Sequence, residues 1–592
     1  MAASRDRDRP PPETCHDRRA QGPAMAVRRC LYLALVLACA AVPLALLGRA
    51  LGAGGWTVAE GLIWALALVV SPWIATLGAS ALVGFAVLMA GRDPLAVVWP
   101  EARLDPDRPI GIRTAILLCI RNEDTRAVLA RIRPLLFALE AQGVGERFAL
   151  FVLSDTRDPA HAAEEEAAFA AFRATLPWPD RTAYRRRESN EGFKAGNVME
   201  FVRARSAGFE AMITLDADSV MTADAVLRLV RLIEQNPRVA LIQTLIAAQP
   251  TAAAFPRLFQ FGMRHGMRAY AAGIAWWQGA DGPYWGHNAI IRIAPFRDHA
   301  ALPALPDGAS ILSHDQVEAA LLRGAGWEVR LDPLEQGSYE ANPPSLLAFM
   351  RRDLRWMAGN LQYLALLRLP LFSWMGRVQL VLAILLFLWS PVVVAIALAA
   401  LANALDADPR AAVALGPGLA ATALFALLFF APKLLGALEV ALKPALRRRW
   451  GGGATLAAGV AAEFLFYLLL VPLSALNQTV GMAGLALGRR IGWAPQTRED
   501  RRVPLADAAR ALWWHTLAGV GLLAGFALAG TTAFLWALPF LVGAALAIPY
   551  CVLTADPAFG RRLAAARLAA IPEELDPASP FPPLLSAPAR AA

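Results

Sequence analysis

Two carboxylates one residue apart, Asp216 and Asp218, directly follow the apolar run Met212–Leu215. In an extended segment residues i and i+2 point to the same side, so both carboxylates can face one ligand. Hard divalent cations prefer oxygen ligands, and Mg²⁺ often binds through one or two carboxylates together with substrate phosphates. The pattern therefore indicates a divalent metal that holds a nucleoside diphosphate. The alternative is a surface turn, because turns also favour Asp.

A glycine-rich stretch, Asn190–Asn197, carries a cation and precedes a predicted helix. Gly192 and Gly196 permit a close approach of the backbone to a ligand. Lys194 at a helix start is a natural contact for a phosphate or a nucleotide. The alternative is a turn with a solvated lysine.

Two further clusters lie towards the end of the polar region. Ser313–Glu318 precedes an amphipathic segment, so Asp315 is either an acid–base residue or only a helix cap. Arg351–Trp356 is either part of a site or a basic amphipathic helix on anionic lipid, with Trp356 as an interfacial anchor.

The composition is that of a membrane protein. The chain has 592 residues, of which 57% are hydrophobic and 18% charged, and its mean hydropathy is +0.43; these values are too apolar for a soluble enzyme of this size. Its net charge of +9 comes from arginines beside apolar runs, which the positive-inside rule explains, so nucleic-acid binding is not expected. The five cysteines have no paired or metal-ligand spacing.

Residues 98–369 have the pattern of a soluble α/β domain. Short apolar runs alternate with helical stretches such as 160–174 and 223–235, which predicts a mainly parallel sheet. The predicted strands are Thr114–Ile120, Phe148–Leu153, Ala211–Leu215, Val239–Thr244 and Trp327–Leu331. Ligands bind beyond the carboxyl ends of such strands. Candidate ligand contacts at these ends are Asn122, Glu123, Asp155, Asp216 and Asp218.

The remaining chain divides into membrane segments and tails. We expect a disordered cytoplasmic tail over 1–27, transmembrane helices over 28–92, transmembrane and interfacial helices over 375–553, and a cytoplasmic tail over 554–592. Pro72 is expected to kink or break its helix. The arginine clusters place both termini and the α/β domain in the cytoplasm, which requires an even number of crossings, six or eight. Basic residues flank 456–488 on both sides, so this stretch is a tight pair of spans or an in-plane segment.

The clusters, taken as an ordered set, resemble the processive, inverting family-two glycosyltransferases that build cellulose, hyaluronan and related glucans. The set comprises Asp155, Lys194 with Gly196–Asn197, Asp216–Asp218, His314–Asp315 and Arg352–Trp356. Gly286–Arg292, Val317–Leu321 and Tyr339–Leu361 look particularly like the branch that makes the backbone of osmoregulated periplasmic glucans. The similarity covers about residues 90 to 500.

This resemblance implies a polytopic α-helical membrane protein with an inserted cytoplasmic α/β domain of the glycosyltransferase A type, in the bacterial inner membrane. It implies UDP-glucose as donor, a growing β-glucan as acceptor, and Mg²⁺ or Mn²⁺ as cofactor. Membrane lipid and periplasmic glucan-processing proteins would be its partners.

The resemblance also implies a role for each site residue. Asp155 would hold the uracil or ribose and Lys194 would contact the nucleotide, while Asp216 and Asp218 would hold phosphate and metal. Asp315 would be the general base. In the last cluster, Arg352 and Arg355 would face the pyrophosphate and Trp356 would form the floor under the acceptor sugar.

The sequence departs from the cellulose-synthase pattern at three places. That pattern has Gln where this chain has Arg352, Thr or a similar residue before an acid at Ser313–His314, and paired acids at Ser154–Thr156. These differences match the periplasmic-glucan branch. The alternatives are a non-processive lipid-linked sugar transferase, another family-two polysaccharide synthase, and a transporter or scaffold that only binds a nucleotide sugar.

Overall fold

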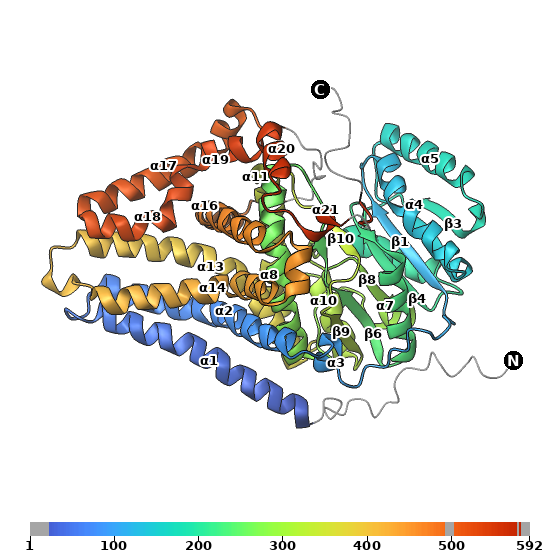
Figure 1. The fold of residues 1–592 in the computed structure, drawn as a ribbon, viewed down its shortest axis with the longest axis horizontal. Helices are drawn as coiled ribbons and strands as arrows, with labels where there is room; N and C mark the ends of the chain where they lie inside the picture. The colour runs from blue at the N-terminus through green and yellow to red at the C-terminus, as the bar shows by residue number, and fades with distance from the viewer. Residues whose placement is uncertain (1–22, 490, 492–501, 577–578, 582–592) are drawn as a thin grey trace.

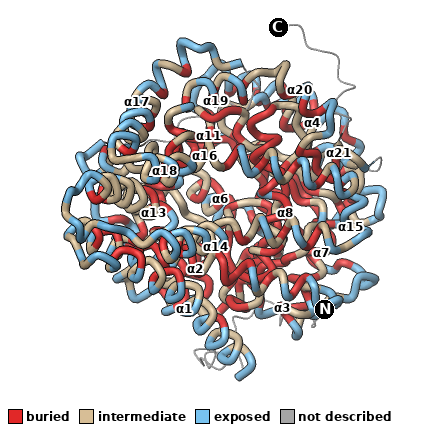
Figure 2. Tube along the Cα trace, turned by 60° about the vertical axis from the view of Figure 1, so that its left-hand side comes forward, coloured by how far each residue is buried: buried red, intermediate tan, exposed pale blue. Residues whose placement is uncertain are grey.

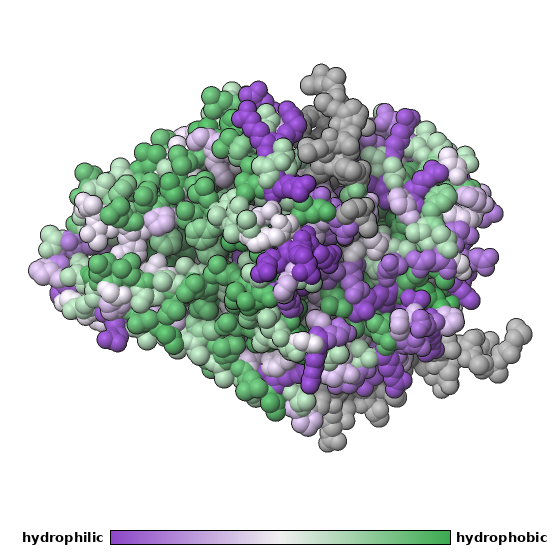
Figure 3. Space-filling model, viewed as in Figure 1, coloured by the Kyte–Doolittle hydropathy of each residue, from purple (hydrophilic) through white to green (hydrophobic). Residues whose placement is uncertain are grey.

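A computed structural model describes residues 23–489, 491, 502–576 and 579–581. It contains an α/β domain and a bundle of long helices that extends away from it on the left of Figure 1. The space-filling view shows hydrophobic side chains over the bundle and hydrophilic ones gathered over the domain (Figure 3). The division between apolar and polar regions predicted from the sequence is therefore present in the fold.

The domain is built on a seven-stranded sheet with the order β3-β2-β1-β4-β8-β6-β9. Neighbouring strands run parallel except β8, which is antiparallel to both β4 and β6. The strands are β1 (Thr114–Ile120), β2 (Phe148–Ser154), β3 (Thr182–Arg186), β4 (Ala211–Asp216), β6 (Val239–Thr244), β8 (Ala289–Arg292) and β9 (Glu328–Asp332). The five predicted strands are confirmed to within a residue or two. β3 and β8 were not predicted.

Helices cover both faces of this sheet because alternate strand residues point to opposite sides. Ile116 and Leu118 of β1 pack in the core with α4 (Thr125–Ala141), α5 (Pro159–Ala174) and α7 (Ala223–Gln235). Ala115 and Leu117 pack in a second core on the other face with α6 (Phe193–Ala204), α9 (Ile293–His299) and α10 (Asp315–Gly324). Buried on both faces, the strands are nearly continuous apolar runs, as is typical of parallel sheets.

A second, small sheet lies beside the carboxyl end of β4. It has the order β5-β10-β7, formed by Val220–Met221, Ser338–Glu340 and Ala247–Ala248. β5 begins two residues after Asp218 and pairs antiparallel with β10. The segment after the two carboxylates is therefore held by a strand from more than a hundred residues later in the chain.

Six helices of the described chain are long and apolar enough to cross a membrane, and one bent pair would make a seventh. The six are α1 (Pro23–Leu51), α2 (Val58–Met89), α13 (Trp374–Leu405), α14 (Leu415–Leu442), α16 (Gly453–Ala486) and α17 (Leu505–Ala529). The bent pair is α18 (Thr531–Ala545) with α19 (Ala547–Thr554), at 54°. Much of α1, α13, α17 and α18 is coloured as exposed or intermediate in Figure 2, as expected for a lipid-facing surface. Of the two predicted numbers of spans, the described residues can supply six but not eight.

Two expected helix breaks are absent from α2 and α16, while the kink at Pro72 stays a prediction. Pro72 neither ends nor splits α2, which runs unbroken through it, because neighbouring helices and local adjustments can satisfy the backbone that proline frees. Residues 456–488 do not form a pair of spans either, since α16 is one continuous helix of 34 residues. Along its length α16 packs against α8 (Ala254–Gln278) and α11 (Leu346–Leu361) as well as against bundle helices. It is one of the six helices that could cross a membrane, and the in-plane alternative stays a prediction.

α8 connects the domain to the bundle, although its sequence lies within the region expected to be soluble. It packs against α2, α14 and α16. Gly84 of α2 faces the backbone of Ala269, and Gly273 of α8 faces the backbone of Ser80, so a side chain at either glycine would collide with the other helix. Small residues of this kind let two helices approach closely.

The two expected tails differ from the structure where it describes them. Residues 1–22 lie outside the described part, and α1 already begins at Pro23. Beyond Thr554 the chain forms α20 (Pro557–Ala565) and α21 (Pro572–Leu575), which pack back towards the domain. The remaining C-terminal residues, 577–578 and 582–592, lie outside the described part.

Candidate active site

The sheet brings the predicted ligand contacts to one edge. β1 pairs in parallel with β2 and with β4, with Ile120 opposite Ser154 and Cys119 opposite Asp216. The residues that follow these strands therefore lie side by side, as predicted.

Lys194 joins three of the predicted clusters. Its ammonium group donates to the carboxylate of Asp216 and to the carbonyl oxygen of Gly286, at 2.8 Å. Gly286 in turn lies against Asp315, since a Cβ at this glycine would be 3.6 Å from the Cβ of Asp315. Burial lowers the pKa of Lys194, but the charges of Asp216 and other groups, including Asp315, outweigh it and raise the pKa. Lys194 is therefore a fixed cation between the two carboxylates.

Two glycines permit this arrangement. Gly192, the N-cap of α6, has a φ of 67°, and Gly286 has a φ of 88°. Both values lie in the left-handed region that side chains disfavour. Gly192 starts α6 so that Lys194 points to the strand edge, and Gly286 leaves room for Asp315.

Asp315 does not occupy the capping position. The N-cap of α10 is His314, which makes no side-chain capping bond, and Asp315 is the first helical residue. Its neighbour His314 instead contacts Glu318 at 2.9 Å. Among the residues the structure describes, the Asp315 side chain has no hydrogen-bond partner, so its carboxylate is available as an acceptor.

The arginines of α11 are buried, which contradicts the interpretation of this helix as a basic surface on lipid. Arg352 and Arg355 are each 8% exposed. The guanidinium of Arg352 lies 4.4 Å from the centre of the Trp356 ring, and that ring is 49% exposed. Burial lowers the pKa of Arg352, opposed by the charges of Glu340, Asp353 and Asp218. The Arg351–Trp356 cluster is thus brought near Asp218 of the first cluster.

The carboxylate of Asp155 is engaged by protein groups. Arg187 donates to it at 2.5 and 2.9 Å, and Asn197 donates at 2.8 Å. The predicted contact of Asp155 with uracil or ribose stays a prediction. Arg187 is a site residue that the sequence reasoning missed.

The neighbouring contacts at β1 involve backbone as well as side chains. Asn122 has a φ of 61°, and its amide donates to Thr156 at 2.8 Å. Glu123 accepts a hydrogen bond from the amide of Arg121. Both residues lie at the predicted edge, and their contact with substrate stays a prediction.

Two further residues that were not predicted, His287 and Glu340, lie beside the end of β4 that carries Asp216 and Asp218. The ring of His287 lies 3.2 Å from Glu340 and 3.2 Å from the hydroxyl of Ser219, which accepts from the amide of Asp216 at 3.0 Å. Burial lowers the pKa of His287, but Asp216 and Glu340 raise it to about 9 overall. The signal for these residues was present, because Gly286–Arg292 and Tyr339–Leu361 both contribute to the family resemblance.

A metal would have to be held by few protein groups. Within the described residues no group of three or more His, Cys, Asp or Glu side chains is placed to hold a metal ion. Asp216 and Asp218 supply two carboxylates, which suits a cation that takes its other ligands from substrate phosphates and water. The residues present therefore fit Mg²⁺ or Mn²⁺ only together with a diphosphate.

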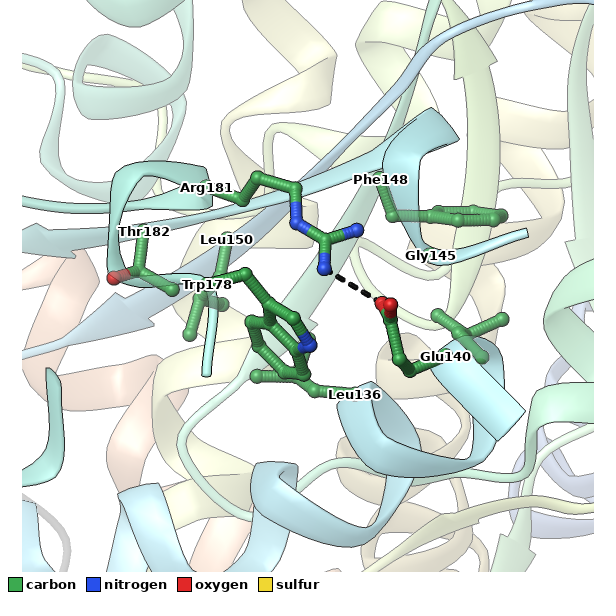
Figure 4. A pocket seen from close by; sticks show the side chains of 9 residues that line it. Leu136, Glu140, Gly145, Phe148, Leu150, Trp178, Arg181 and Thr182 are labelled. Carbon is green, nitrogen blue, oxygen red and sulfur yellow. Dashed lines mark hydrogen bonds and ion pairs between the residues drawn. The ribbon is translucent and has the colours of Figure 1, made fainter. Parts of the chain in front are cut away.

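The pocket in Figure 4 lies elsewhere, at the end of β2 opposite to the candidate site. Leu136, Phe148 and Trp178 line it, and the ion pair of Arg181 with Glu140, at 2.6 Å, closes one side. None of the predicted site residues lines it.

Comparison with known proteins identifies the family. Residues 116–300 match the model of glycosyl transferase family 2, and residues 211–434 match glycosyl transferase family group 2. The glucans biosynthesis glucosyltransferase H of Rhodopseudomonas palustris (strain TIE-1) is 36% identical over 93% of this chain and 78% of its own length. That of Caulobacter vibrioides (strain NA1000 / CB15N) is also 36% identical, over 90% and 85%.

A structure of GalNAc-T7 with UDP, GalNAc and Mn²⁺ is similar at a TM-score of only 0.29, with 12% identity over 47% of this chain and 55% of that chain. This likeness carries no argument about the site. The sequence relatives confirm the predicted resemblance and the predicted fold class, and they decide the family. This chain belongs to the glucans biosynthesis glucosyltransferase H family, and it is a membrane glycosyltransferase of glucan synthesis with a family 2 domain.

Proposed function

We propose that the protein transfers glucose from UDP-glucose to the end of a growing β-glucan by a single inverting displacement, and passes the chain to the periplasm. The observation that carries the proposal is the cluster in which Lys194 links Asp216 to the Gly286 turn beside Asp315. It sets a cation and a metal-binding carboxylate next to a carboxylate that can accept a proton.

The chemistry requires one base and positive charge for the leaving group. Asp315 takes the proton of the acceptor hydroxyl as its oxygen bonds to the anomeric carbon of glucose. The bond from that carbon to UDP breaks on the opposite side, so the configuration inverts and UDP carries away the electron pair. Lys194, Arg352 and Arg355 face the diphosphate. A divalent ion held by Asp216 and Asp218 would add charge neutralisation for the leaving group.

The acceptor site follows from α11. Trp356 offers a half-exposed aromatic face, held in place by the stacked Arg352, and such a face suits the apolar side of a sugar ring. α11 leads through α12 (Tyr363–Leu366) into the bundle helix α13. A glucan end on Trp356 would therefore lie where the domain meets the membrane helices, which favours a processive synthase over a lipid-linked sugar transferase.

The donor is tested with membranes that contain the protein and a panel of UDP-sugars. We expect incorporation from UDP-glucose into a long product, whose linkage methylation analysis would give. Incorporation from another UDP-sugar would show that UDP-glucose is not the donor and would point to a different family-two polysaccharide synthase. A single sugar on a lipid would favour the non-processive alternative, and binding without transfer would favour a transporter or scaffold.

The location of the domain is a separate part of the proposal. Donor supply requires the α/β domain in the cytoplasm of a bacterial inner membrane, and the arginine clusters favour the same side for both termini. Any glucan-processing partners would lie on the periplasmic side. A cysteine at the exposed position 180, on a background without other cysteines, should be labelled in inverted vesicles and protected in intact cells. Labelling in intact cells would place the domain outside.

A further inference from the structure

The described C-terminal segment, residues 557–576, docks onto the start of α8. Gly560 of α20 packs so closely on the backbone of Ala252–Ala254 that a side chain there would collide with it. Leu563 and Ala569 are buried in the core that α8 shares with α16 and α19. The segment is thus an integral part of the junction between domain and bundle.

Two adjacent carboxylates fix this segment by buried ion pairs. Glu573 binds both terminal nitrogens of Arg264, at 2.8 and 2.6 Å, and Glu574 binds Arg257 at 2.6 Å. Arg257 also donates to the carbonyl of Leu568 at 2.7 Å. All four charged side chains are at most 7% exposed, so both pairs hold the segment on α8.

Of these two carboxylates, Glu573 also reaches the second sheet. Its carboxylate accepts a hydrogen bond from the hydroxyl of Tyr339 at 3.0 Å. Tyr339 lies in the middle of β10, and Phe581 packs edge-on against its ring with 5.0 Å between centres. Glu574 makes no contact with β10 among those the structure describes.

β10 is bonded to both sides of the candidate site. On one side it pairs with β5, Tyr339 opposite Val220, two residues beyond Asp218. On the other side Asn288 donates to the Ser338 hydroxyl at 3.0 Å and to the Tyr339 carbonyl at 3.1 Å. A shift of β10 would therefore move the carboxylate loop and the Gly286–Asn288 turn at once.

We propose that Glu573 is a positioning residue for glycosyl transfer, which fixes β10 through Tyr339 and thereby aligns the Asp216–Asp218 loop with the turn beside Asp315. The proposal rests on the proposed function of that site. In this arrangement the C-terminal segment does not touch substrate. It sets the distance between metal ligands and base, and displacements of about 1 Å in such a geometry cost up to roughly 10²-fold in rate.

The test compares Glu573→Ala with Glu574→Ala in the full-length protein. Both changes remove one buried ion pair between the segment and α8, so both should lower the melting temperature by similar amounts. Only Glu573→Ala removes the acceptor of Tyr339. We expect its turnover per folded molecule to fall roughly 10-fold or more, and the donor concentration for half-maximal rate to rise, while Glu574→Ala keeps turnover near wild type.

Two further variants separate positioning from docking. Tyr339→Phe keeps the packed ring and removes only the hydroxyl, so it should reproduce the loss of turnover without the loss of melting temperature. The double variant Glu573→Ala, Tyr339→Phe should be no slower than Glu573→Ala, because both changes break one interaction. Glu573→Gln, which retains an acceptor oxygen, should recover most of the turnover.

Equal losses of turnover in Glu573→Ala and Glu574→Ala, or normal turnover in Tyr339→Phe, would overturn the proposal. All rates are measured with whichever donor the wild-type protein uses best. If UDP-glucose fails as donor, the proposed function fails while the comparison among variants stays valid.

Discussion

Charged side chains gather in two groups, one at the strand edge and one along α8. The site edge consists of Lys194, Asp216, Asp315 and Arg352. The α8 belt consists of Arg257, Arg264 and Arg268, which are seven and four residues apart and share one helix face, with their partners Glu335, Glu439, Glu573 and Glu574. Both groups pair lysine or arginine with carboxylates, yet they differ in access to solvent.

The difference lies in the carboxylates: the side chain of Asp216 is 33% exposed, whereas those of the belt are at most 13% exposed. In the belt every arginine is paired with at least one carboxylate. Charges that remain accessible can exchange a protein partner for a ligand, while closed pairs can only hold elements together. We therefore expect changes at the site edge to alter rate and changes in the belt to alter stability, with the exception of Glu573, which also accepts the hydrogen bond of Tyr339.

Removal of divalent metal should have the largest effect, because Asp216 and Asp218 cannot neutralise a leaving diphosphate by themselves. Excess EDTA should abolish glucose incorporation by membranes, and added Mg²⁺ or Mn²⁺ should restore it. Melting temperature without substrate should not change, since the belt needs no metal. Full activity in excess EDTA would remove the metal from the mechanism.

Substitution of the base should have the next largest effect. Asp315→Asn keeps the size of the side chain but cannot accept the acceptor proton, so turnover should fall by about 10² to 10⁴. UDP affinity should stay near normal because Lys194 and Asp216 are unchanged. Both quantities are measured on the same detergent-extracted protein. If more than about a tenth of the turnover remains with normal UDP binding, the base is another group, such as Glu318 or His314.

The role of the α8 belt is tested at Glu439, which binds Arg268 at 3.0 and 2.8 Å and Lys443 at 2.9 Å. Glu439→Leu removes a fully buried carboxylate whose partners, Arg268 and Lys443, are partly exposed. The cost should therefore stay below the roughly 3–5 kcal/mol for breaking a fully buried pair. We expect a clear loss of melting temperature with normal turnover per folded molecule. Asp298→Leu removes an exposed pair with Arg297 and should cost less than about 1 kcal/mol. Equal stability of the two variants would remove the distinction between belt and surface.

The helices and strands that carry the site edge were predicted well because most of them are long apolar or amphipathic runs in the sequence. β1, β6 and α7 have the predicted bounds, since their apolar runs are long and clearly ended. Lys194, Asp216 and Asp315 also lie together, as the family resemblance implied. The site edge depends mostly on local patterns and on one topological rule.

What the sequence did not predict depends on pairing between distant segments. β8 has four residues and is a strand only because β4 and β6 bond to it from both sides. β10 has three residues, and its partners lie about a hundred residues earlier. In the sequence Glu573 and Glu574 look like any acidic pair in a polar tail. Their role is visible only in the fold, where they pair with Arg264 and Arg257. The spacing of the arginines in α8 was the available signal for the belt.

The smallest expected effect concerns Asp353, which lies on α11 between the two groups. Burial raises the pKa of this carboxyl to about 6, although Gln478 donates a hydrogen bond to it and Arg352 lies nearby. The unfolded carboxyl has a pKa near 3.9, so between about pH 4 and pH 6 the folded state binds more protons than the unfolded state. The free energy of unfolding should therefore fall by up to roughly 3 kcal/mol as the pH rises through this window, because of the difference between the two pKa values, and then stay level.

The variant Asp353→Asn has no such proton to lose. Its melting temperature relative to wild type should be higher at pH 7.5 than at pH 4.5, as followed by fluorescence in detergent. If the difference in melting temperature between variant and wild type is the same at pH 4.5 and pH 7.5, Asp353 is already ionised in the folded protein at pH 4.5. It would then behave like an accessible carboxylate of the site edge.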